Sequence, residues 1–261
     1  MAKICPLFSS SSGNSLYISF GENGILVDVG VNAKRILSAL NERDINEDSI
    51  KAIFITHTHN DHISALKVLL KKLNVPVFAS TKTLNYLCDN GLVLDSANLI
   101  DISSKKQDLG FVGAEFFETS HDCEGSGGYN FYYNNQKISV CTDLGYVSEK
   151  VRNSICGSEL IYFESNHDIN MLTKGNYPPY LHQRILGEKG HLSNSSCAAE
   201  LPLFLNKGAK KIILGHLSKE NNLPVLAKSA ATAALMEIGA KEQYDYMLYI
   251  APPSGGKMVY F

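Results

Sequence analysis

Short apolar runs that end in turn or polar residues alternate with longer amphipathic stretches along most of the chain. Short apolar runs predict strands, and apolar positions spaced three or four residues apart predict helices. We expect strands over 51–56, 75–79, 114–119, 160–164, 210–214 and 246–251, and a hairpin formed by 17–20 and 24–29. Helices are expected over 63–72, 81–90, 195–206 and 222–238. This alternation is typical of layered α/β proteins.

A second hairpin is expected near the middle of the chain. Residues 130–133 and 137–142 have the pattern of two strands joined across Asn134 and Asn135. Asparagine tolerates the positive φ angles that a type I′ turn requires. The segment 166–191, in contrast, is polar, contains consecutive prolines and has only a weak regular pattern. A long segment of this kind is commonly functional, and we expect it to face the substrate.

The composition favours one compact domain over residues 1–261, because 261 residues with 44% hydrophobic content can bury a sizeable core. The formal net charge is -2, so no global field attracts nucleic acid or an anionic membrane. The chain shows no secretory apolar segment and no apolar run long enough to span a bilayer. We therefore expect a cytoplasmic protein without a membrane partner. The sequence does not indicate the oligomeric state.

The run His57-Thr58-His59-Asn60-Asp61-His62 follows a β-branched strand and precedes a helix. Such a turn can direct three imidazoles and a carboxylate to one side. Imidazole nitrogen and carboxylate oxygen suit zinc, manganese and iron, whereas burying these groups without a partner is costly. A metal site explains this run better than an exposed, histidine-rich turn does.

Three further candidate ligands lie at the C-terminal ends of predicted strands, where strand ends on one sheet edge converge. They are His121, Asp143 and His216. Taken singly, such residues are more often core or capping groups, but together with the run they favour a metal centre. Two cations about 3.5–4 Å apart can hold a bridging hydroxide and clamp the oxygens of a scissile phosphate or ester. That hydroxide would attack the substrate, and Asp61 would orient it or accept a proton.

Another group of residues has the character of a substrate site. His191 comes directly before a predicted helix, and a cationic imidazole beside the first helical amides suits a phosphate. We assign to His191 the protonation of the leaving group, with helix capping as the alternative. The remaining candidate substrate contacts are His167, Arg184, Ser193 and Asn194. His167 is equally well interpreted as an ordinary loop histidine, and the serine-rich turn 9–15 as a flexible connection.

The order HxHxDH, then His, Asp and His, with Asp28 ahead of it in Leu26-Val27-Asp28-Val29-Gly30, resembles the metallo-β-lactamase superfamily over essentially the whole chain. The resemblance implies an α/β fold, the αββα sandwich, with two mixed β-sheets packed face to face and helices outside. It implies that one metal is bound by His57, His59 and His121 and the other by Asp61, His62 and His216, with Asp143 bridging them. Asp28 would support the ligand loop or simply cap a turn. Aspartate at position 143 argues against an antibiotic-destroying member.

Segments that coordination does not require resemble the bacterial YycJ/WalJ-like branch. They are the serine-rich turn, 164–168, 177–178, 184–185 and 190–194. This resemblance implies an exonuclease that degrades double-stranded DNA 5′ to 3′ and acts in DNA repair. The scarcity of basic clusters weakens this interpretation, since DNA binding normally needs a basic surface, although a metal cluster itself attracts phosphate.

The alternatives are a small-molecule (cyclic) phosphodiesterase, a glyoxalase II-type thioesterase and a metal-binding regulatory scaffold without turnover. The phosphate-suited segment around His191 favours a phosphodiester over a thioester. A complete ligand set counts against a scaffold. The expected cofactors are two divalent metal ions, and the ligand types leave zinc, manganese and iron open.

Overall fold

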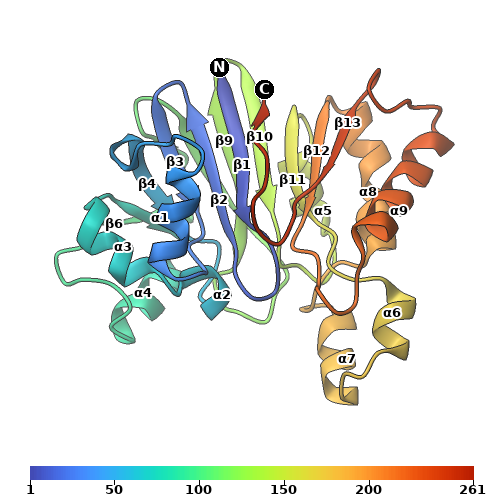
Figure 1. The fold of residues 1–261 in the computed structure, drawn as a ribbon, viewed down its shortest axis with the longest axis horizontal. Helices are drawn as coiled ribbons and strands as arrows, with labels where there is room; N and C mark the ends of the chain where they lie inside the picture. Colours follow the sequence, from blue (N-terminus) through green and yellow to red (C-terminus); the bar gives the residue numbers. More distant parts are fainter. The chain divides into compact units, whose positions relative to one another are not determined.

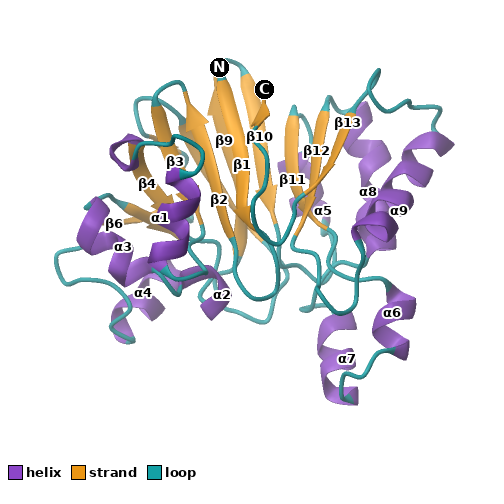
Figure 2. Ribbon diagram, viewed as in Figure 1, coloured by secondary structure: helices purple, strands orange, loops and turns teal.

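The computed structural model describes residues 1–261 and contains two seven-stranded mixed sheets (Figures 1 and 2). The chain divides into two compact units. Unit 1 comprises Met1–Phe116, Cys123–Ser126 and Pro252–Phe261, and unit 2 comprises Phe117–Asp122 and Gly127–Ala251. That these units form one domain stays a prediction.

The first sheet has the strand order β14-β1-β2-β3-β4-β5-β6. Its strands are β1 (Ala2–Phe8), β2 (Ser15–Phe20), β3 (Asn23–Val27), β4 (Ile50–Phe54), β5 (Val77–Ala79), β6 (Leu99–Asp101) and β14 (Val259–Tyr260). Strands β1, β2 and β3 pair antiparallel, and β3 to β6 pair parallel. The expected first hairpin and the strand that delivers the histidine run are therefore confirmed.

The helices of unit 1 bury apolar faces against this sheet. They are α1 (Ala33–Asn41), α2 (Asn60–Ile63), α3 (Leu66–Leu73) and α4 (Thr81–Asp89), with a 3₁₀ turn at Glu47–Ser49. Ile36 of α1 and Leu69 of α3 pack in one core with Leu26 and Ile53 of the strands. The helix expected over 63–72 is instead divided in two, because the amide of Ala65 donates to the carbonyl of Val29, outside the helix.

The second sheet has the strand order β13-β12-β11-β10-β9-β8-β7. Its strands are β7 (Gln107–Asp108), β8 (Gly113–Glu118), β9 (Gly127–Tyr133), β10 (Gln136–Cys141), β11 (Leu160–Glu164), β12 (Lys211–Gly215) and β13 (Met247–Ile250). Strands β10 to β13 are parallel, so their C-terminal ends share one edge. Asn134 and Asn135 have φ of 47° and 64°, which confirms the type I′ turn between β9 and β10.

Five helices belong to unit 2: α5 (Glu149–Ile155), α6 (Ile169–Lys174), α7 (Pro179–Leu186), α8 (Asn194–Asn206) and α9 (Pro224–Glu237). Leu201 and Phe204 of α8 pack with Phe163 and Ile212 of the sheet. The polar segment 166–191 is more regular than expected, since it contains α6 and α7. Both helices are too short to give a clear periodicity, and they extend away from the sheet of their unit (Figure 2).

The expected metallo-β-lactamase fold is confirmed at the level of two mixed sheets with helices. None of the helices combines the length and the apolar character that a membrane span requires.

Candidate metal centre

The first group of candidate ligands lies in unit 1, with His57 and His59 in the loop after β4 and Asp61 and His62 in α2. His57 and His62 are almost fully buried, whereas His59 and Asp61 are half-buried. His57 Nε2 lies 3.0 Å from His59 Nδ1, and the ring centroids of His57 and His62 are 4.1 Å apart. Asp61 Oδ2 lies 3.5 Å from His62 Nε2. The turn therefore gathers the four donors that the sequence run supplies.

The buried carboxylate of Asp28 orients two of these histidines. Its Oδ2 accepts the hydroxyl of Thr56 at 2.8 Å and lies 2.8 Å from His62 Nδ1. A carboxylate only accepts, so a neutral His62 carries its proton on Nδ1 and presents a lone pair at Nε2. The Thr56 hydroxyl has donated to Asp28 and therefore accepts from His57 Nδ1 at 3.0 Å. Asp28 thus makes Nε2 the acceptor nitrogen of both rings, the nitrogen that would face a metal, as outer partners of metal ligands commonly do.

The backbone of this turn is held by the segment that follows β3. Val29 donates its amide to the carbonyl of His62 at 2.7 Å. A Cβ at Gly30 would overlap the carbonyl of Asp61 and lie 2.6 Å from the amide nitrogen of His62. Glycine at position 30 is therefore what permits the close approach of the two segments.

The second group of candidate ligands lies in unit 2. His121 follows β8, Asp143 follows β10 and His216 follows β12. Asp143 Oδ1 lies 3.3 Å from His216 Nδ1 and 3.8 Å from His121 Nε2. His121 Nδ1 lies 3.1 Å from the carbonyl oxygen of Gly190 and donates to it, which leaves Nε2 as the acceptor nitrogen. Burial lowers the pKa of His121, with Asp143 opposing the shift, and favours the neutral ring that a metal requires.

Glu164, at the end of β11, is a site residue that the sequence reasoning missed. Its side chain is fully buried, and Oε1 lies 2.9 Å from His191 Nδ1 and 2.8 Å from His216 Nδ1. Oε2 accepts the amides of Leu144 and Leu192. Burial raises the pKa of Glu164, but the charges and hydrogen bonds of His191 and His216 together outweigh that effect and leave it lowered. The feature of the sequence that could have identified it is a glutamate at the end of an otherwise apolar, buried strand.

Three of the predicted site residues have strained backbone conformations. Asp28, Asp143 and His216 have φ of 60°, 58° and 56°, in the left-handed region that costs L-residues roughly 1–2 kcal/mol. Such strain persists where the surroundings enforce it, and it is concentrated at functional sites. The conformations therefore support a functional role for these positions.

The donor chemistry fits divalent cations. Asp143, Glu164, His191 and His216 offer ligand atoms that all lie within 4.8 Å of one another. Both oxygens of Glu164 already accept the hydrogen bonds described above. We therefore assign Glu164 to orienting His191 and His216 and not to binding a metal. The imidazole nitrogens and the aspartates are of the types that bind zinc, manganese or iron.

Three of the predicted substrate residues, His191, Ser193 and Asn194, lie at or just before the start of α8. His191 does not cap α8, because the cap is Ser193, whose hydroxyl accepts the amide of Ser196 at 3.0 Å. Asn194 is buried and bonds Ser165 and Asn222. The hydroxyl of Ser193 and the amide of Asn194 are thus committed within the protein.

Two other candidates have different surroundings. Arg184 is exposed and forms an ion pair with Asp122. His167 is 1% exposed, and neither of its ring nitrogens has a hydrogen-bond partner. Burial lowers the pKa of His167 to about 4, so the ring is neutral near pH 7. Contact of either residue with a substrate stays a prediction.

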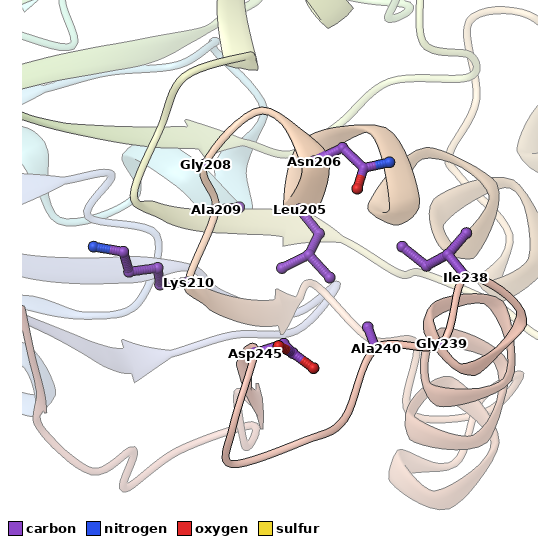
Figure 3. A pocket seen from close by; sticks show the side chains of 9 residues that line it. All are labelled: Leu205, Asn206, Gly208, Ala209, Lys210, Ile238, Gly239, Ala240 and Asp245. Atoms are coloured by element: carbon purple, nitrogen blue, oxygen red, sulfur yellow. The ribbon is translucent and has the colours of Figure 1, made fainter.

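A cavity of about 420 Å³ in unit 2 (Figure 3) lies at the opposite end of β12 from His216. Residues 208–210 line it and precede β12, whereas His216 follows that strand. Five strand residues separate the two ends by roughly 16 Å. Its lining contains neither histidine nor cysteine, and its Lys210 is paired with Glu159 at 3.7 Å. Hydrolytic chemistry is therefore assigned to the donors and not to this cavity.

The two mixed sheets and the histidine and aspartate donors define a metallohydrolase. The chain belongs to the metallo-β-lactamase superfamily, whose family description matches residues 10–216. It is 36% identical over 236 residues to the exodeoxyribonuclease YycJ of Bacillus anthracis, covering 89% of each chain. It is 35% identical over 254 residues to the exodeoxyribonuclease WalJ of Streptococcus pneumoniae, covering 96% of this chain and 94% of the relative. The resemblance to the YycJ/WalJ-like branch is thereby confirmed.

A solved structure shares the fold. The metallo-β-lactamase fold protein YhfI from Bacillus subtilis superposes with a TM-score of 0.73 over 99% of both chains, at 14% identity. At that identity the similarity concerns the fold alone.

Proposed function

We propose that the protein is a dinuclear metal-dependent phosphodiesterase that degrades DNA from an end. The observation that carries the proposal is the pairing of His191 with the buried Glu164, 2.9 Å apart, beside the candidate ligands Asp143 and His216. A metal-binding scaffold has no use for a histidine that is held next to the ligands by a separate carboxylate. Two relatives that match about nine-tenths of the chain or more are named exodeoxyribonucleases, which supports DNA as the substrate.

The ligands divide into two sets in this proposal. Following the family resemblance, His57, His59 and His121 would hold one cation, Asp61, His62 and His216 would hold the other, and Asp143 would serve both. When bound, the two cations lower the pKa of a water molecule and neutralise charge on the phosphate oxygens. Asp61 orients the attacking water, because its carboxylate belongs to the same ligand turn.

His191 supplies the proton that the leaving oxygen needs. Glu164 accepts from Nδ1 of His191 and fixes the orientation of the ring, so that Nε2 is the nitrogen that would donate the proton. General acid catalysis by a positioned side chain contributes about 10²- to 10⁴-fold in rate. We propose His167, Arg184, Ser193 and Asn194 as further groups near the substrate, with Ser193 and Asn194 acting through the start of α8.

Exonuclease polarity and pathway extend the proposal. We propose 5′ to 3′ degradation of double-stranded DNA and a role in repair, following the implication of the YycJ/WalJ-like resemblance. The protein's charge gives little general attraction to DNA, since the formal net charge is -2 and basic residues such as Lys72 and Lys210 are paired with Glu47 and Glu159. Binding is therefore expected to depend on the metal centre and a few local contacts.

The decisive assay offers three substrates to protein loaded with manganese or with zinc. Duplex DNA labelled at the 5′ or the 3′ end, a small cyclic or aryl phosphodiester, and a glutathione-type thioester are compared, with Asp61→Ala as the inactive control. Mononucleotide release from the 5′-labelled end is expected. Hydrolysis of only the small phosphodiester or only the thioester would establish one of the alternative activities, and no turnover with full metal loading would indicate a scaffold.

The role of His191 is tested separately. His191→Ala should lower kcat about 10²- to 10⁴-fold on a substrate with a poor leaving group, with much less effect on an activated aryl ester. Metal content should stay at the wild-type value. Equal loss of metal and of activity would mean that His191 is structural.

A further inference from the structure

Asn14 approaches the ligand turn from the connection between β1 and β2 in unit 1. This connection is the serine-rich turn 9–15. Its backbone is anchored on both sides, because Asn14 donates its amide to the carbonyl of Asp61 at 2.8 Å and accepts the amide of Gly30 at 2.7 Å. The side chain is buried, with 8% of its surface exposed.

The orientation of the Asn14 amide follows from its partners. The amide of Ser10 donates to Asn14 Oδ1 at 3.1 Å, so the oxygen faces the serine-rich turn. The Nδ2 group consequently faces the ligands, 3.0 Å from His62 Nε2 and 3.3 Å from Asp61 Oδ2. One rigidly held donor therefore contacts two of the proposed ligands to one cation.

The tautomer of His62 determines which atom donates in its contact with Asn14. Because Nδ1 of His62 donates to Asp28, a neutral ring presents a lone pair at Nε2. Without a cation at Nε2, Asn14 Nδ2, 3.0 Å away, would donate into that lone pair and keep the buried acceptor hydrogen-bonded. A cation that takes the lone pair leaves the Asn14 N–H groups to the carboxylate of Asp61.

We propose that Asn14 is a positioning residue for the Asp61 and His62 ligand pair. It holds His62 Nε2 in the direction of the cation before the cation binds, and afterwards it fixes the rotation of the Asp61 carboxylate. The inference rests on the proposed function only in that it requires the metal site. It does not require that the substrate be DNA.

The experiment compares Asn14→Leu, which keeps the approximate volume and removes both N–H donors, with Asn14→Ala. The matched control is Asn130→Leu, because Asn130 is also buried but lies in β9 and bonds Ser139 and Ser154. Zinc affinity of metal-stripped protein is measured by competition with a chromogenic chelator. Removing an outer partner of a ligand typically weakens metal binding about 10- to 100-fold. We expect that loss for one of two zinc ions in both Asn14 variants and for neither ion in Asn130→Leu.

A second readout examines the metal-free protein. The ¹⁵N shift of His62 Nε2 should move toward that of a free lone pair in Asn14→Leu and stay unchanged in Asn130→Leu. Wild-type affinity for both ions in the Asn14 variants, or an equal loss in the control, would overturn the assignment. A wild-type protein that binds two zinc ions and leaves DNA intact would refute the proposed function while the role of Asn14 stands. A wild-type protein that binds none of zinc, manganese and iron would overturn both.

Discussion

Gly30→Ala tests whether the ligand turn depends on close backbone packing. The added Cβ would lie 2.6 Å from the amide nitrogen of His62, whereas ordinary contact begins near 3.4 Å. The turn would have to withdraw by at least the difference, 3.4 − 2.6 = 0.8 Å. Metal–ligand distances tolerate only about 0.2 Å. Overpacking of this kind costs roughly 1–3 kcal/mol of unfolding free energy, but the larger effect should fall on the metal bound by Asp61 and His62.

The assay is the zinc content after gel filtration, combined with the affinity of each ion. We expect Gly30→Ala to lose one of two ions, with affinity lowered by on the order of 100-fold or more, because more than one ligand moves. The control is Gly239→Ala, where nothing lies within 4 Å of the new Cβ and only the positive φ of 78° is unfavourable. It should lose roughly 1–2 kcal/mol of stability and keep both ions. Two ions bound with wild-type affinity in Gly30→Ala would refute the packing argument.

Three other changes probe the site in different ways. Asp28→Asn should weaken zinc binding about 10- to 100-fold, since asparagine keeps one acceptor oxygen where the two oxygens of Asp28 accept from Thr56 and His62; unchanged calorimetric affinity would contradict this role. His167 has a pKa of about 4 when folded and about 6.5 when unfolded, so the unfolded chain binds the proton first as the pH falls. Between pH 6.5 and 4, the unfolding free energy of the wild type, measured with urea, should fall by up to about 1.4 kcal/mol per pH unit more than that of His167→Leu. Above pH 6.5 the two should not diverge, and parallel pH profiles over the whole range would disprove the prediction. Arg184→Ala should change stability by less than about 0.5 kcal/mol, and if Arg184 binds a phosphate it should reduce the salt slope of DNA affinity by about 1, whereas an unchanged slope would exclude that contact.

Local patterns were sufficient for much of the fold. The strand before the histidine run, the Asn134-Asn135 turn and helix α8 are specified by residues close together in the chain. Short polar helices such as α6 and α7 were missed because six to eight residues seldom show a clear period. The helix after the ligand run was predicted as one segment because its periodicity does not reveal the hydrogen bond that Ala65 makes with Val29.

The candidate ligands were predictable from the sequence because donor types and strand ends are readable along the chain. His57, His59, Asp61 and His62 lie within six residues, and a metal is the simplest reason for such a cluster. The groups that orient them were not predictable in this way. Glu164 is 27 residues from His191 and 52 from His216, and Asn14 is 48 residues from His62.

The amino-acid sequence alone determined to which family the chain belongs and which side chains are the candidate metal ligands, since both depend on residue types in a fixed order. Only the tertiary structure decided that Glu164 holds two histidines through one oxygen, that Ser193 caps α8 in place of His191, and that Gly30 admits the ligand turn. Those facts depend on hydrogen bonds and van der Waals distances between distant segments. Such distances exist only after the chain has folded.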